Sequence, residues 1–243
     1  MERNGRKILP KYIASTATIR NAEEQIRCLY SRDRFSQFPP DGLDAGDSCF
    51  MREIPLSQKP FRQYAGICAS GQSMKTTIVR LFSIILHTAY DLSQNSEYAD
   101  YIDPYYTLIG YFNSIRELGG ARRMLDDDIV SRLKLLGKRY GENGQRYLNN
   151  FSGVKEITSR IPSWQITDVL EKLAIPYNKA LPPDKQKCYD VVIATNMISV
   201  GMDVDRLGTM AVVGQPKQNS EYIQATSRVG QKFPRINQAL LFL

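Results

Sequence analysis

The chain has 243 residues, of which 42% are hydrophobic and 23% charged. This balance is typical of a folded protein of one or two domains, and it excludes collagen-like, low-complexity and disordered classes. The 32 basic residues against 25 acidic ones give a charge of +7, which suits a polyanionic partner, although an ordinary basic surface explains the charge equally well.

Neither a metal site nor a membrane segment is indicated. Four cysteines form no CxxC pair and only one histidine accompanies them, so we expect no metal site. The amino-terminal residues 1–11 are polar and basic, and the longest apolar run, 81–86, is too short to span a bilayer. We therefore expect a cytoplasmic protein with reduced thiols and no membrane contact.

In chain order, the first predicted element is a β-prone run over 11–18, which leads into a helix over 19–30. Residues 31–62 contain several prolines and glycines without a sustained period, which predicts an irregular connector. From residue 63 on, strands are predicted over 64–69, 105–112, 154–158, 191–194, 210–214 and 236–243. Helices are predicted over 73–92, 116–140, 164–173 and 220–229, and a polar loop over 91–104.

This alternation predicts an α/β fold with a mostly parallel sheet and crossover helices. In such sheets ligands bind beyond the carboxyl ends of the strands, so the residues that follow each strand are candidates for a site. Small hydroxyl residues and glycines there expose backbone amides that suit phosphate oxygens. Taken singly, each is more often a turn, a helix cap or a solvated charge.

Taken in order, the strand-end segments resemble the second half of a superfamily 2 helicase. The matching segments are 16–18 for motif III, 108–114 for motif IV, 156–160 for motif IVa, 194–204 for motif V and 224–230 for motif VI. The sequences of residues 111–121 and 222–230 are most similar to the helicase component of DISARM anti-phage systems. The resemblance covers about residues 11–240.

The resemblance implies a RecA-like carboxy-terminal lobe of an ATP-dependent helicase or translocase, a P-loop NTPase lobe without its own P-loop. ATP with Mg²⁺ would be held mainly by a missing amino-terminal lobe, and both lobes would grip nucleic acid, DNA rather than RNA. Residues 1–30 would be the tail of that amino-terminal lobe, 31–62 a connector, and 63–243 the carboxy-terminal lobe, truncated at its end. Other defence-system subunits are further expected partners.

Roles for individual residues follow from the same resemblance. Thr16 and Thr18 would couple hydrolysis to lobe movement. Contacts to backbone phosphates are implied for Asn113, Ser114, Ser159, Arg160 and Thr195. Contacts to the nucleotide are implied for Gly201, Asp203, Gln224 and Arg228, with catalysis assigned to Arg228 and Gln231.

The sequence departs from a complete motor in three places. Residues 69–76 imitate a phosphate-binding loop, but Ala69 and Met74 replace both required glycines. The acidic triplet 126–128 lies in a helical context, which predicts a solvated acidic turn and not a magnesium-binding motif. Gln231 stands where the family pattern has an arginine. The replacement removes a positive charge that would stabilise the transition state of phosphoryl transfer.

We therefore expect an incomplete chain that does not hydrolyse ATP on its own. The alternative is a non-hydrolytic nucleic-acid-binding module that keeps the fold without the motor. An unrelated α/β nucleotide-binding enzyme is the third reading. An upstream segment with a phosphate-binding loop and an acidic motif would favour the helicase.

Overall fold

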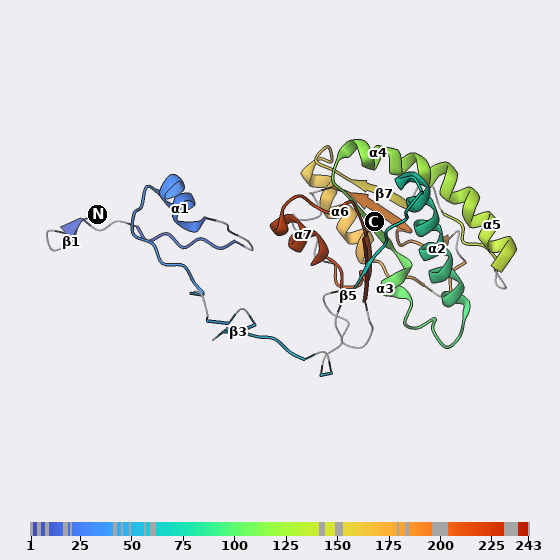
Figure 1. Cartoon of the computed structure of the whole chain (residues 1–243), viewed down its shortest axis with the longest axis horizontal. Helices are drawn as coiled ribbons and strands as arrows, with labels where there is room; N and C mark the ends of the chain where they lie inside the picture. The colour runs from blue at the N-terminus through green and yellow to red at the C-terminus, as the bar shows by residue number, and fades with distance from the viewer. Residues whose placement is uncertain are drawn as a thin grey trace. The chain divides into compact units, whose positions relative to one another are not determined.

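The computed structural model forms two compact units, Met1–Pro55 and Leu56–Leu243 (Figure 1). It describes residues 2–3, 6–7, 10–16, 19, 21–40, 43–44, 46–48, 50–55, 57–58, 62–140, 144–148, 153–178, 180–182, 185–195, 204–230 and 238–242. The division falls inside the predicted connector 31–62. The assignment of 1–30 to an amino-terminal lobe and of 63–243 to a carboxy-terminal one stays a prediction.

The described residues of the first unit form little regular structure. Its elements are the strand pairs β1 (Glu2–Arg3) with β2 (Arg6–Lys7) and β3 (Asp47–Ser48) with β4 (Met51–Arg52), and helix α1 (Ala22–Tyr30). Asn21 caps α1 by accepting a hydrogen bond from the Glu24 amide, yet no residue of the helix is buried. The strand predicted over 11–18 is wrong for its described residues, 11–16, for which the described part of the chain supplies no strand partner.

The second unit is built on a six-stranded sheet whose printed pairings are all parallel. The strand order is β5-β10-β9-β6-β8-β7. In chain order the strands are β5 (Arg62–Gly66), β6 (Leu108–Phe112), β7 (Val154–Ile157), β8 (Val191–Ala194), β9 (Thr209–Val213) and β10 (Gln238–Phe242). The predicted α/β fold with a parallel sheet is confirmed, because parallel neighbours require crossover connections and helices supply them.

The crossover helices are α2 (Met74–Gln94), α4 (Ile115–Met124), α5 (Val130–Tyr140), α6 (Ser163–Ala174) and α7 (Asn219–Thr226). The short helix α3 (Asp103–Tyr106), which has Pro104 in its first turn, and the last turn of α2 replace parts of the loop predicted over 91–104. Between α4 and α5 the chain stays helical through a π-helical turn, η1 (Leu125–Ile129).

The acidic triplet lies in η1, so the prediction of a helical context is confirmed, and its carboxylates are exposed or half-exposed on a π-helical turn. Asp126 pairs with Arg122 one turn earlier, at 3.2 Å, and Asp128 pairs with Lys75 of α2 at 2.9 Å. Two of the three carboxylates therefore join neighbouring helical segments.

The alternation of side chains along the buried strands divides the core into two clusters. On one face, Leu108 and Phe112 of β6 pack with residues of α2, α4, η1 and α5. On the other, Ile109 and Tyr111 of the same strand pack with residues of α6 and α7. Because both faces are covered, β6, β8 and β9 are buried along their whole length and read as continuous apolar runs.

Candidate nucleic-acid interface

Three of the predicted phosphate contacts follow adjacent parallel strands. Asn113 follows β6, Thr195 follows β8, and Ser159 follows β7 after one intervening residue. These strands are neighbours in the order β6-β8-β7, and the Thr195 amide donates to the Ile157 carbonyl at 3.3 Å. Since strands lie about 4.8 Å apart, the carboxyl ends of β6 and β7 are about 10 Å apart. The structure brings these residues to one edge of the sheet, as predicted.

The turn after β7 presents two of these side chains to solvent. Thr158 is buried, and its carbonyl accepts a hydrogen bond from the Ile161 amide at 3.0 Å. Ile161 packs against the core cluster that α6 and α7 cover. Ser159 and Arg160 lie between these two anchors and are exposed. The charged group of an arginine held in this way stays in water, where an anion can reach it.

Asn113 has a structural partner that the sequence does not reveal. Its side-chain Nδ2 donates to the Gly214 carbonyl at 3.0 Å, across the ends of β6 and β9. Gly214 has a φ of 75°, and a Cβ built there would lie 2.9 Å from Asn113 Nδ2. Ser114 caps α4 by accepting a hydrogen bond from the Glu117 amide at 3.2 Å. Asn113 therefore joins the ends of β6 and β9, and Ser114 stabilises the start of α4.

Replacing Asn113 by alanine is expected to destabilise the second unit by about 0.5–1.5 kcal/mol, because one hydrogen bond between the β6 and β9 ends is lost. Urea unfolding measures this change through the transition midpoint. The matched variant Asn219→Ala removes an exposed amide at the start of α7 and is expected to change the midpoint little. If Asn113→Ala leaves the midpoint unchanged, this hydrogen bond contributes nothing to stability.

Helix α7 is tied to the central strand by a buried phenol. The Tyr111 hydroxyl donates to Glu221 Oε1 at 2.6 Å, which joins β6 to the first turn of α7. Burial, followed by this hydrogen bond, raises the pKa of Tyr111, so the phenol remains a donor at neutral pH. The contact fixes the helix that carries Gln224.

The residues predicted to reach the nucleotide lie at the end of α7. The helix ends at Thr226, so the prediction of a helix to 229 is wrong, and Arg228 lies in the turn after it. Gln224 and Arg228 therefore do not share one helical face. Gly230 has a φ of 79°, as a turn there requires, and its amide donates to the Leu207 carbonyl at 2.7 Å.

Several predicted site residues are not placed. Thr18, Gly201, Asp203 and Gln231 lie outside the described residues. Thr16 is described, exposed and part of the first unit. The roles predicted for these five residues stay predictions.

The segment that imitates a phosphate-binding loop does join a strand, β5, to a helix, α2. Its helix terminus is already capped, because Ser73 Oγ accepts from the Thr76 amide at 3.1 Å. The lysine of the imitated motif, Lys75, pairs with Asp128. The cap and the ion pair occupy groups that a phosphate would need, which agrees with the interpretation that 69–76 is not a phosphate-binding loop.

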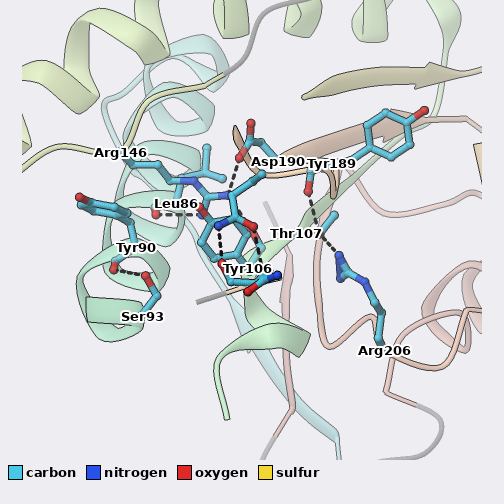
Figure 2. A network of polar contacts seen from close by, with 11 residues as sticks. Leu86, Tyr90, Ser93, Tyr106, Thr107, Arg146, Tyr189, Asp190 and Arg206 are labelled. Atoms are coloured by element: carbon cyan, nitrogen blue, oxygen red, sulfur yellow. Dashed lines mark hydrogen bonds and ion pairs between the residues drawn. The ribbon is translucent and has the colours of Figure 1, made fainter. Parts of the chain in front are cut away.

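The amino ends of the strands hold a buried polar network (Figure 2). The Arg146 side chain has no exposed surface and pairs with Asp190 at 2.9 Å. It also donates to the carbonyls of Tyr106 and Leu86, at 2.8 and 3.2 Å, and its guanidinium lies 3.9 Å from the centre of the Tyr106 ring. Burial raises the pKa of Tyr106. These groups precede β6 and β8, at the edge opposite the predicted phosphate contacts.

A second arginine extends this network. Arg206 donates to Thr107 Oγ1 at 2.8 Å and to the Ile175 carbonyl at 2.9 Å, and Thr107 Oγ1 donates in turn to the Tyr189 carbonyl at 2.7 Å (Figure 2). No sequence pattern marks either arginine as buried, since an isolated arginine is most often a solvated charge. The network joins segments that are distant in sequence, and we assign it to stability.

Comparison with known protein families gives a match to the helicase conserved C-terminal domain over residues 142–232. Residues 142–232 are therefore similar to a helicase C-terminal domain. This domain includes β7, β8, β9 and α7, and thus the turn that carries Ser159 and Arg160. The predicted resemblance to the carboxy-terminal domain of a helicase is confirmed.

Among curated proteins, the chain is 54% identical over 225 residues to the DISARM protein DrmA of Bacillus paralicheniformis. The alignment covers 93% of this chain and 19% of the relative, so the chain spans about a fifth of that protein's length. The predicted similarity to the helicase of a DISARM system is confirmed.

Solved structures give weaker likenesses. One is Mss116p DEAD-box helicase domain 2 bound to an RNA duplex, at 12% identity and a TM-score of 0.42, covering 75% of this chain and 54% of the other. Another is the Mycobacterium smegmatis helicase Lhr bound to single-stranded DNA and AMP-PNP, at 17% identity and a TM-score of 0.40, covering 75% of this chain and 19% of the other.

In the described part of this chain, no helix combines the length and apolar character needed to cross a membrane.

Proposed function

We propose that the helicase domain forms the carboxy-terminal half of an ATP-dependent nucleic-acid motor in a cytoplasmic anti-phage defence system. The observation that carries the proposal is the row of Asn113, Thr195 and Ser159 at one sheet edge, with Arg160 exposed beside it. The match to the helicase C-terminal domain and the similarity to DrmA support the assignment of this edge to nucleic-acid binding.

The chemistry of the edge favours the nucleic-acid backbone over the bases. Hydroxyl, amide and guanidinium donors suit phosphate oxygens, and they carry no pattern that distinguishes one base from another. We expect binding without sequence preference, with DNA preferred over RNA, and with an affinity that falls steeply as salt rises.

The nucleotide part of the proposal rests on α7 and the segments around it. Gln224 and Arg228 offer amide and guanidinium donors of the kind that bind phosphate, and both are half-buried, Gln224 in the last turn of α7 and Arg228 in the turn that follows it. ATP with Mg²⁺ would supply the phosphoryl group whose hydrolysis drives movement between lobes. Gly201, Asp203 and Gln231 complete the proposed nucleotide contacts, while Thr16 and Thr18 would couple the lobes.

The nucleic-acid part is tested by the variant Arg160→Ala. Because Arg160 is exposed at the proposed backbone contact, its loss is expected to reduce the slope of log affinity against log salt by about one unit on single-stranded DNA. Fluorescence anisotropy of a labelled oligonucleotide, measured at several salt concentrations, gives the slope.

The matched control is Arg139→Ala. Arg139 is exposed in the last turn of α5. The continuous helical segment α4-η1-α5 begins at the carboxyl end of β6, and Arg139 lies at its other end. This variant removes the same charge and is expected to leave the slope unchanged. Equal slopes for Arg160→Ala and the unaltered chain would contradict the assignment of Arg160 to a phosphate contact.

A further inference from the structure

Trp164 is the only tryptophan of the chain, and 70% of it is exposed to solvent. Tryptophan has one of the largest apolar side chains and is usually well buried in a folded protein. This one lies in the first turn of α6, four residues after Arg160. An aromatic ring thus stands in water close in sequence to the proposed backbone contact.

The packing of α6 explains why Trp164 stays outside the core. Val169 and Leu173 bury the inner face of this helix in the cluster with β6, β8 and β9. Trp164 precedes Val169 by five residues and Leu173 by nine. Around the helix axis it therefore lies roughly 140° from Val169 and roughly 180° from Leu173. The indole is therefore on the outer face.

The segment that leads to Trp164 is held firmly. Thr158 is buried, Ile161 packs on the core, and Pro162 immediately precedes α6, where its fixed φ suits the entry to a helix. The exposed side chains of this segment, Ser159, Arg160 and Trp164, are thus carried on one short anchored stretch. A cation followed by a pre-positioned aromatic ring is the combination by which proteins bind single strands without reading sequence.

We propose that Trp164 stacks on a base of a bound single strand whose phosphates contact Ser159 and Arg160. The inference rests on the proposed nucleic-acid function and adds base stacking to it. The indole offers an apolar face to any base, so it strengthens single-strand binding without making it sequence-specific. It also favours a single strand over a duplex, whose bases are already stacked.

The test uses the unaltered chain and two probes with the same number of phosphates, oligothymidylate and an abasic oligomer. Because Trp164 is the only tryptophan, its fluorescence reports on this position alone. We expect oligothymidylate to quench that fluorescence and the abasic oligomer to bind with little quenching. Trp164→Ala is expected to weaken oligothymidylate binding by about 5- to 150-fold and abasic binding by less than twofold.

Two further variants separate stacking from other effects. Trp164→Phe keeps an aromatic face and is expected to retain most of the affinity. Tyr101→Ala removes an exposed aromatic side chain that precedes the amino end of β6, and it is expected to change neither affinity. Circular dichroism confirms folding of each variant, and the quenching measurement needs no variant.

The outcomes distinguish the two proposals. Binding of both probes with equal quenching, or equal loss of both affinities in Trp164→Ala, overturns stacking and leaves the backbone contact intact. If the unaltered chain binds neither probe, the nucleic-acid function is contradicted and the stacking role with it.

Discussion

Replacing Arg228 by alanine is expected to lower ATP turnover by a factor of about 10³–10⁵ when the chain is joined to a matching amino-terminal nucleotide-binding lobe. An arginine that meets the charge developing on the transferred phosphoryl group acts mainly in the transition state, so turnover falls more than ATP affinity. Phosphate release in the presence of single-stranded DNA, together with ATP binding, measures both quantities. Arg139→Ala is the matched control and is expected to leave turnover unchanged.

The same two-lobe protein tests position 231. Gln231→Arg is expected to raise turnover, because glutamine supplies a neutral dipole where the family pattern supplies a charge. If this variant leaves turnover unchanged while folding and ATP affinity are intact, the alignment of motif VI at this position is wrong. If Arg228→Ala also has no effect, the motor is contradicted and the non-hydrolytic binding module takes its place.

Replacing Arg146 by methionine is expected to destabilise the second unit by about 3–5 kcal/mol. The substitution leaves Asp190 as a buried carboxylate without its cation, and it also removes the donors to the Tyr106 and Leu86 carbonyls. Urea unfolding followed by circular dichroism gives the change in the transition midpoint.

The expected loss of stability is large because the Arg146–Asp190 pair is buried. An exposed ion pair of the same length is expected to contribute much less. Lys75 pairs with Asp128 at the same 2.9 Å as Arg146 with Asp190, but both of its members are well exposed. Lys75→Met is therefore expected to cost less than about 1 kcal/mol.

The double variant Arg146→Met, Asp190→Asn removes both charges of the buried pair. It is expected to be more stable than the sum of the two single changes predicts, because no uncompensated charge remains. Additive losses would show that Arg146 and Asp190 are not coupled.

The sequence alone determined the strands and the long helices of the second unit, but not the short helix α3 or the end of α7. All six strands predicted after residue 63 are present, because strands covered on both faces need unbroken apolar runs that are visible in the chain. It also predicted the edge at which the candidate site lies, since the carboxyl ends of parallel strands share one edge. The resemblance to helicase motifs further implies a common role for Asn113, Ser159, Arg160 and Thr195, which stays a prediction.

Only the tertiary structure decided the order of the strands and the partners of the polar residues. Local pattern places β6 and β8 as strands but does not make them neighbours, and it cannot show that Asn113 reaches the Gly214 carbonyl. The run over 11–16 shows the converse, because a β-prone segment needs a strand partner and none of the described strands pairs with it. Arg146 reads as a solvated charge until the fold brings Asp190 and Tyr106 around it, since contacts over such sequence separations exist only once the chain has packed.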